Sequence, residues 1–172
     1  MTKRLSSEIL IDEERIRRTV EAMARAIAAD TPSETPLSVL AVMDGAFMFC
    51  ADLVRRLPMP IHLGLVKLVS IDRGGEPERI VFPPDFPLRG ADVLVVEDIL
   101  DTGKTMTALV ERLALERPAR LRLAMLLDKP SRRIVDLEPD YVGFEVDDRW
   151  VVGYGLDHQG LYRNLPYITF VE

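Results

Sequence analysis

Two adjacent carboxylates, Glu97 and Asp98, stand directly after the apolar run 93–96, and the segment Asp101-Thr102-Gly103-Lys104-Thr105 follows shortly after them. In an open α/β sheet, ligands bind beyond the carboxyl ends of the strands. A glycine-containing loop that leads into a helix offers free backbone N–H groups and a partial positive charge, and both favour phosphate. The two threonines add hydroxyl donors. This stretch therefore predicts a phosphate-binding site with two carboxylates beside it.

The end of this segment, Gly103-Lys104-Thr105, also occurs in the P-loop of nucleoside triphosphatases. That motif requires a glycine five residues before Gly103, and position 98 is Asp. Two carboxylates at this place would repel a triphosphate unless a metal ion lay between them. The P-loop interpretation is therefore disfavoured.

The elements that must position this segment follow from apolar periodicity and from the prolines and glycines between them. Helices are predicted over residues 12–29, 46–57 and 104–116. Strands are predicted over residues 37–43, 61–70, 93–96, 120–127, 141–146 and 150–154. Alternating strands and helices favour the α/β class, with a mainly parallel sheet flanked by helices. Residues 71–89, rich in glycine and proline, predict a hairpin or a flexible flap.

The composition restricts the class of protein further. A chain of 172 residues fits one domain, and a net charge of −6 argues against a nucleic-acid partner, which needs a basic face. No apolar stretch is long enough to span a membrane. The single cysteine, Cys50, lies in an apolar run and is expected to be buried and unreactive. We therefore expect a cytoplasmic protein that acts on neither membranes nor nucleic acids.

The segment 93–105 resembles the phosphoribosyl pyrophosphate (PRPP) signature of type I phosphoribosyltransferases. Residues 127–133, 140–145, 151–157 and 162–167 resemble the second half of the hypoxanthine-guanine members of that family. The resemblance implies a single phosphoribosyltransferase domain over residues 1–172, with a flap near 71–89 and a base-binding hood from the C-terminal part. It implies purine salvage, in which Mg²⁺-dependent transfer of ribose-5-phosphate from PRPP to N9 of hypoxanthine or guanine gives IMP or GMP and pyrophosphate.

The same resemblance assigns roles to the first site residues. Glu97 and Asp98 would accept hydrogen bonds from the ribose hydroxyls, where carboxylates also offset a developing positive charge. Asp101 would act at N7 of the purine as the catalytic base, and a helix N-cap is its alternative role. The 5'-phosphate would be bound by Asp101, Thr102, Gly103, Lys104 and Thr105.

A second group of residues matches the family's base-binding positions. Lys129 would donate to O6 of the purine and so select a 6-oxo base, because an ammonium group can only donate. Trp150, the only tryptophan, would stack on the base, and Val151 would offer its backbone carbonyl to the amine of guanine. Taken singly, Lys129 also fits a surface lysine and Trp150 a core tryptophan. Nearby His158 matches no family role and is expected to be a solvated loop residue.

The remaining implied contacts concern pyrophosphate and metal. Pyrophosphate would be bound by Asp44, Gly45 and Arg163, and Mg²⁺ by Asp157, Glu97 and Asp98. Asp44 departs from the family pattern, which usually has a basic residue before the glycine. We expect a cis peptide bond between Met43 and Asp44, which would turn backbone N–H groups toward pyrophosphate while the acidic side chain points away.

The predicted flap also departs from the family pattern. The flap residues Ser70 and Ile71 occupy the place of a usual Ser-Tyr pair, and Ile71 lacks the hydroxyl.

Two alternative functions stay open: a PRPP-sensing regulator on the same fold, and an enzyme that prefers xanthine. Enzymes for pyrimidines or 6-aminopurines are disfavoured by Lys129. The family also implies a homo-oligomer, either a dimer or a tetramer, and the preference among hypoxanthine, guanine and xanthine stays open.

Overall fold

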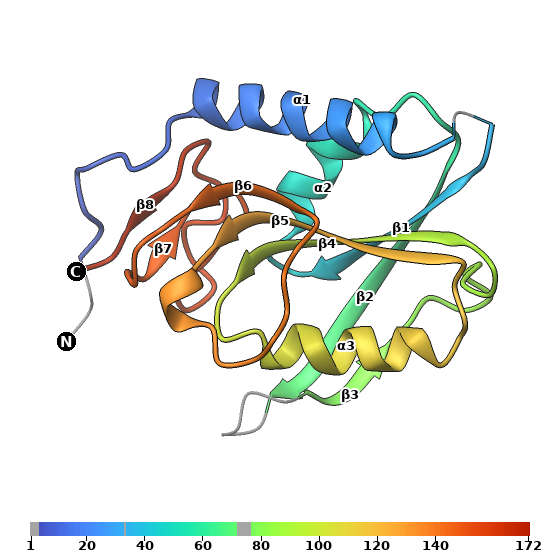
Figure 1. Ribbon diagram of the computed structural model, residues 1–172. Coiled ribbons are helices and arrows are strands. Elements are labelled where there is room, and N and C mark those ends of the chain that lie inside the picture. Colours follow the sequence, from blue (N-terminus) through green and yellow to red (C-terminus); the bar gives the residue numbers. More distant parts are fainter. Residues whose placement is uncertain (1–3, 33, 72–76) are drawn as a thin grey trace.

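The structure is a computed structural model that describes residues 4–32, 34–71 and 77–172 (Figure 1). Its centre is a six-stranded sheet with the order β3-β2-β1-β4-β5-β6. The strands are β1 (Leu37–Met43), β2 (Ile61–Ile71), β3 (Pro77–Val81), β4 (Asp92–Leu100), β5 (Arg120–Asp128) and β6 (Tyr141–Glu145). All neighbouring pairs are parallel except β2 and β3, which form an antiparallel hairpin. The predicted α/β class with a mainly parallel sheet is confirmed.

Helices cover both faces of this sheet. Helices α1 (Glu13–Ala29) and α2 (Phe47–Val54) lie on one face, and α3 (Lys104–Ala114) lies on the other (Figure 1). Helices α1 and α2 pack on one apolar cluster, and α3 packs on a second cluster on the opposite face. Both faces of the central strands are therefore buried, as parallel sheets require. The sheet is therefore a rigid base for the segments that leave its strand ends.

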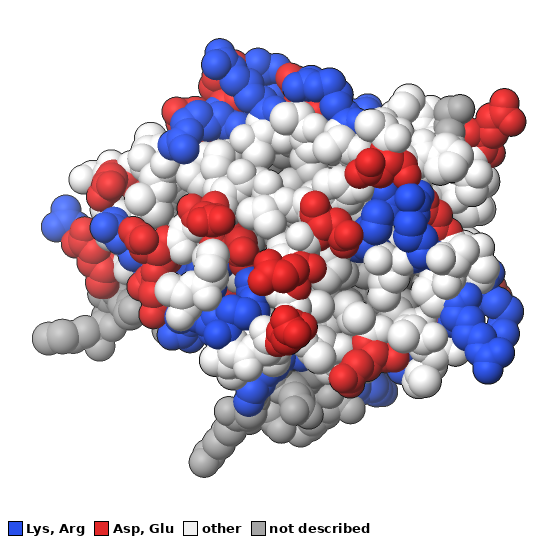
Figure 2. Space-filling view, in the orientation of Figure 1, with Lys and Arg blue, Asp and Glu red and all other residues white. Residues whose placement is uncertain are grey.

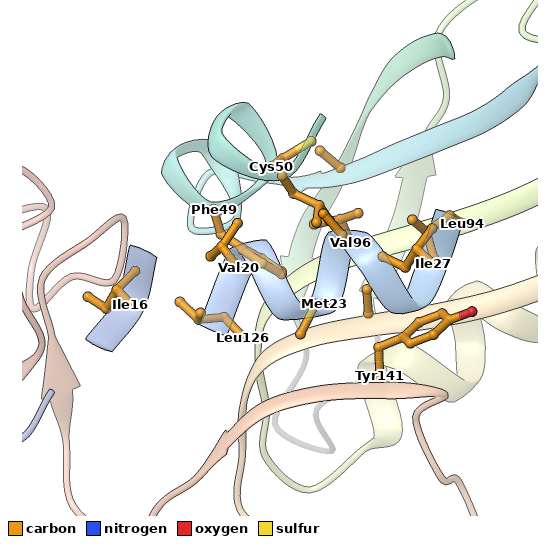
Figure 3. Packing of buried hydrophobic residues seen from close by; sticks show 14 of the residues in the cluster. Ile16, Val20, Met23, Ile27, Phe49, Cys50, Leu94, Val96, Leu126 and Tyr141 are labelled. Carbon is orange, nitrogen blue, oxygen red and sulfur yellow. The ribbon is translucent and has the colours of Figure 1, made fainter. Parts of the chain in front are cut away.

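Helix α1 shows how the sequence pattern produces this packing. Its N-cap Asp12 accepts a hydrogen bond from the backbone N–H of Arg15 at 2.8 Å, which satisfies a donor of the first turn. Its buried apolar side chains recur every three or four residues and point into the sheet (Figure 3): Ile16, Val20, Met23 and Ile27. The predicted helix 12–29 is thus confirmed, with Asp12 as its cap.

Several predicted ends of helices and strands were wrong, and the end of β4 matters most for the site. The strand does not end before Glu97 but continues to Leu100, because the parallel register with β5 runs on through the pair Leu100 and Asp128. The predicted helix 46–57 ends at Val54, and the predicted helix 104–116 ends at Ala114. The carboxylates therefore belong to the strand itself and not to the loop behind it.

A second, two-stranded sheet lies beyond the carboxyl ends of β4 and β5 (Figure 1). The predicted strand 150–154 is reduced to β7 (Val151–Val152), which pairs antiparallel with β8 (Thr169–Phe170). The N-terminal segment adds isolated bridges, including one between Ile11 and Ile168. Strand β8 was not predicted, because two residues carry no usable periodicity and this strand depends on partners from both ends of the chain.

The predicted flap, residues 71–89, begins as the hairpin of β2 and β3. Residues 72–76, at its tip, lie outside the described residues, as do the side chains of the flap residues Ser70 and Ile71. No helix in the part of the chain that the structure describes is long and apolar enough to cross a membrane. Figure 2 shows acidic side chains interspersed among the basic ones on the face in view, so the described residues form no continuous basic surface there.

Candidate active site

The proposed site residues gather where the parallel strands end. Asp44 and Gly45 follow β1, Glu97 and Asp98 lie near the end of β4, and Lys129 follows β5. Strands β1, β4 and β5 are direct neighbours in the sheet, so their carboxyl ends meet at one edge. The topology thus brings together segments that are more than eighty residues apart in sequence.

The loop after β1 approaches the carboxylate of Asp98 on β4 closely. A Cβ atom at Gly45 would overlap the carboxylate of Asp98, so a larger residue here would displace the Asp98 side chain. Gly155 in turn packs against the carbonyl oxygen of Gly45. The peptide bond between Met43 and Asp44 is cis, as predicted, and Asp44 is exposed. The predicted pyrophosphate loop therefore lies directly beside Asp98, one of the two carboxylates predicted to bind the ribose.

Glu97 and Asp98 open into two neighbouring cavities, because successive side chains of a strand point to opposite faces. Glu97 lines a cavity together with Met43 and the loop 101–105. Asp98 lines a second cavity, whose other walls include Lys129 and Trp150. Asp101 lines both cavities and so connects the predicted phosphate side of the site with the predicted base side.

Burial shifts the titration of both carboxylates. Burial raises the pKa of Glu97 well above its usual range, and the neighbouring carboxylate of Asp98 adds to the shift. Burial also raises the pKa of Asp98, although the backbone N–H of Ile99, 2.8 Å from Oδ1, acts in the opposite direction. One buried and one partly buried carboxylate with few hydrogen-bond donors around them are suited to receive hydroxyl groups or a cation.

Replacing Glu97 with glutamine is expected to stabilise the free protein at neutral pH. The folded-state pKa of Glu97 lies above the unfolded-state value of about 4.3, so ionised Glu97 disfavours the folded state once the pH rises above that value. Glu97→Gln should therefore raise Tm at pH 7.5, by about 2–4 °C for each 1 kcal/mol relieved, and the gain should vanish at pH 4.

Thermal unfolding of both proteins at the two pH values checks this. Glu111→Gln on the exposed side of α3 is a matched control and should leave Tm unchanged. Equal Tm values for Glu97→Gln and the parent at pH 7.5 would show that the Glu97 carboxylate carries no burial penalty.

The predicted phosphate loop depends on Gly103. Its φ of 87° lies in the left-handed region, and an added Cβ would come within 2.5 Å of Val135 Cγ2. Gly103 is the N-cap of α3 and makes no side-chain cap bond, so the alternative role of Asp101 as N-cap is wrong. The first turn of α3 leaves backbone N–H groups directed toward this loop, which is the arrangement that binds phosphate.

Two arginines that the sequence analysis did not single out hold Asp101 and the phosphate loop. Arg132 Nε donates to Asp101 Oδ1 at 2.9 Å, and its Nη1 donates to Asp148 Oδ2 at 3.2 Å. Arg133 Nη1 donates to the backbone carbonyl of Asp101 at 3.0 Å, while its Nη2 pairs with Asp128. Both arginines directly follow Lys129-Pro130-Ser131. Their place in the segment 127–133, which resembles the family, was the only feature of the sequence that could have indicated a role for them.

Lys129 is not the surface lysine that its turn position also allowed. It is 6% exposed, and its Nζ donates to the carbonyl oxygen of Arg149 at 2.8 Å. Asp148 Oδ1 lies 3.8 Å from the same ammonium group. A buried ammonium at the wall of a cavity, held by a single backbone acceptor, is suited to donate to a ligand atom there.

Trp150 is not a core tryptophan, because it is 56% exposed and lines the same cavity as Lys129. Its Nε1 donates to the carbonyl oxygen of Asp157 at 3.1 Å. Val151, the next residue, is buried in β7. The expectation that His158 is solvated was wrong, since the residue is half-buried, its Nδ1 is buried, and its ring packs edge-to-face on that of Trp150.

Asp157 and Arg163 lie together beside this cavity. Arg163 Nη2 is 2.8 Å from Asp157 Oδ1, and the backbone N–H of Gly160 donates to Asp157 Oδ2 at 2.6 Å. Both oxygens of Asp157 are therefore engaged within the protein. Among the described residues, no group of three or more His, Cys, Asp or Glu side chains is placed to hold a metal ion.

Solved structures with this arrangement place the chain in the type I phosphoribosyltransferase class. A hypoxanthine phosphoribosyltransferase from Trypanosoma cruzi superposes with a TM-score of 0.90 at 33% identity and covers 100% of this chain and 94% of its own. A hypoxanthine-guanine phosphoribosyltransferase from Bacillus anthracis superposes with a TM-score of 0.88 at 36% identity, with 98% of each chain covered.

The chain belongs to the phosphoribosyltransferase family, since the family model for the phosphoribosyl transferase domain matches residues 6–159. Among similar curated proteins, the hypoxanthine-guanine phosphoribosyltransferase of Aquifex aeolicus is 39% identical over 96% of this chain and 94% of its own length. The hypoxanthine phosphoribosyltransferase of Salmonella typhimurium is 40% identical, over 94% of this chain and 93% of its own.

Proposed function

We propose that this chain is a purine-salvage enzyme that transfers ribose-5-phosphate from PRPP to N9 of hypoxanthine or guanine. The products are IMP or GMP and pyrophosphate. One observation carries the choice of base: the buried ammonium of Lys129 lines the same cavity as Trp150 and Asp101. A fixed donor beside an aromatic face selects a 6-oxopurine, because O6 can accept a hydrogen bond from the ammonium whereas a 6-amino group offers it another donor.

We assign a separate role in this reaction to each group of site residues. The loop 101–105 and the start of α3 bind the 5'-phosphate, while Glu97 and Asp98 accept hydrogen bonds from the ribose hydroxyls and stabilise positive charge as the bond to pyrophosphate breaks. Trp150 stacks on the base and Asp101 accepts the proton at N7. Flap residues Ser70 and Ile71 would exclude water from the reactive ribosyl group.

The carboxylates present fit a magnesium ion that is bound largely by substrate. Mg²⁺ keeps several waters and is usually held by one or two carboxylates together with phosphate oxygens, so a preformed cluster of three side chains is not needed. Glu97, Asp98 and Asp157 would hold it, and Arg163 would be freed from Asp157 to bind pyrophosphate with the loop at Asp44 and Gly45. When bound, the metal neutralises the charge of the pyrophosphate leaving group.

A nucleotide-formation assay tests the proposal. Purified protein, PRPP and Mg²⁺ are incubated with hypoxanthine, guanine, xanthine, adenine and uracil in turn. We expect IMP and GMP to form and adenine and uracil to give no product. Turnover of xanthine above the other bases would indicate the xanthine-preferring alternative, and PRPP binding without any turnover would indicate the regulator.

Lys129→Ala is expected to lower kcat/KM for hypoxanthine and guanine about 10–150-fold, since a hydrogen bond to a charged group contributes about 1.5–3 kcal/mol. The affinity for PRPP should change little, because Lys129 lines only the cavity on the base side. Lys129→Met keeps the apolar stem and should behave like Lys129→Ala if the ammonium matters. An equal loss of PRPP affinity in both variants would contradict the base-binding role.

Asp44→Lys is expected to tighten pyrophosphate binding by up to about fivefold and to leave kcat within about twofold. Asp44 is exposed, and the backbone of its loop would make the contact, so the change removes repulsion and adds a cation. Product inhibition by pyrophosphate measures this. If Asp44 instead holds Mg²⁺, a magnesium titration of the variant will show a sharply raised requirement.

The assembly and location of the enzyme are also part of the proposal. Leu63 and Leu65 lie on one face of β2 and are each about half exposed, whereas parallel sheets are normally covered on both faces. We expect a second copy of this chain to cover them in a dimer or tetramer in the cytoplasm. Light scattering should show dissociation of Leu65→Glu, and a monomeric parent protein would contradict the oligomer.

A further inference from the structure

A tight turn fixes the backbone of His158 beside the proposed base site. The backbone N–H of His158 donates to Leu161 at 3.2 Å, and that of Leu161 donates back to His158 at 3.1 Å. The two central residues, Gln159 and Gly160, have φ values of 55° and 80°, as in a type I' turn. The bond from Gly160 to Asp157 Oδ2 anchors the turn. The backbone of His158 therefore has little freedom.

This turn places the imidazole against Trp150. The two ring centroids are 5.6 Å apart and the ring planes meet at 79°, an edge-to-face contact. The residue before His158 accepts the hydrogen bond of Trp150 Nε1. Trp150 is more than half exposed, so the hydrophobic core does not fix its indole ring. The ring is held instead by these two contacts, which come from the adjacent residues Asp157 and His158.

The contact of His158 is made by its ring and not by a hydrogen bond. Nδ1 is buried and has no hydrogen-bond partner within the described residues. His158 is also not among the described residues that line the cavity of Lys129 and Trp150. It therefore acts on that cavity through Trp150, and another ring of similar size can replace it.

We propose that His158 is a positioning residue that holds the plane of Trp150 ready for the purine. The inference rests on the proposed function. An exposed indole that moves between rotamers must be ordered when the base binds, and a ring already held by His158 avoids that cost. The effect belongs to binding of the base and the nucleotide, while binding of PRPP alone is independent of it.

The first measurement uses Trp150 as its own probe, because it is the only tryptophan of the chain. In His158→Ala we expect emission at longer wavelength, lower anisotropy and faster quenching by acrylamide. His158→Phe should restore the parent values. His62→Ala changes the only other histidine, which is exposed on β2, and serves as the control with no expected effect.

The second measurement separates positioning from general damage to the site. His158→Ala should raise KM for hypoxanthine and Kd for GMP about 2- to 12-fold, the range of an aromatic pair, with KM for PRPP within twofold. His158→Phe should return both constants to within about twofold of the parent values. Calorimetry with GMP gives the second constant without any turnover.

The outcomes separate the two proposals. Loss of affinity for PRPP as large as that for the base, or unchanged Trp150 emission and quenching in His158→Ala, would overturn the inference. It would also be overturned if His158→Phe failed as fully as His158→Ala while still folded. A parent protein that binds GMP but forms no nucleotide refutes the proposed function alone, and one that does not bind GMP refutes both.

Discussion

Asp101→Asn is expected to lower kcat about 10²–10⁴-fold, the usual contribution of a general base. Asparagine keeps the size of the side chain and can still accept the hydrogen bond that Arg132 donates to Oδ1. It cannot take the N7 proton of the purine. KM for PRPP should change little, because the backbone of the loop 101–105 is unaltered. Steady-state kinetics with saturating hypoxanthine measures both constants.

Asp148→Asn provides the matched control for this prediction. Asp148 pairs with the same Arg132 and is exposed. Its replacement therefore disturbs that ion pair while Asp101, the proposed catalytic base, stays unchanged. We expect its kcat to stay within about fivefold of the parent value. Near-normal turnover of Asp101→Asn would reduce Asp101 to a partner of Arg132, and equal losses in both variants would assign the effect to the ion pair.

Removal of magnesium is expected to reduce turnover to near background, and added Mg²⁺ should restore it. The pyrophosphate leaving group carries dense negative charge, and Arg163 is the only cation that the sequence analysis assigned to it. Mg²⁺ is usually held by one or two carboxylates together with substrate phosphate oxygens, so we expect the ion to enter with PRPP. Initial rates in excess chelator, and then in a magnesium titration, measure the dependence.

Two further measurements define the place of the metal. Asp157→Asn should raise the magnesium concentration needed for half-maximal rate, whereas Asp147→Asn, outside the cavity of Lys129 and Trp150, should not. Persistent turnover in excess chelator would remove Glu97, Asp98 and Asp157 as metal ligands.

Features with a local cause could be predicted from the sequence. The strand into Glu97, the glycine at position 103 and the helix behind it form one continuous pattern, because phosphate loops need a special backbone conformation that glycine supplies. The apolar period of α1 and the alternation of strands and helices that defines an α/β fold are local in the same sense. These local patterns determined the fold class and the predicted phosphate site with its two carboxylates, whereas the base-binding, pyrophosphate and metal residues followed only from the family resemblance.

Other features depend on residues that meet only in the folded chain. The extension of β4 to Leu100 needs the register of β5, and the small sheet needs β8 and the N-terminal segment. The burial that raises the pKa of Glu97 and the close approach of Gly45 to the Asp98 carboxylate likewise come from packing across strands. No periodicity within one segment can report such contacts.

The surroundings of Asp101 and Trp150 show the same division most clearly. The family resemblance implied a catalytic base at Asp101 and a stacking ring at Trp150, while the residue types by themselves also allowed a helix N-cap and a core tryptophan. Which partners hold them, Arg132 for the carboxylate and His158 for the indole, was decided by a short helical turn and a tight turn from other parts of the chain. Side-chain chemistry is a local property, whereas orientation depends on neighbours that only tertiary structure supplies.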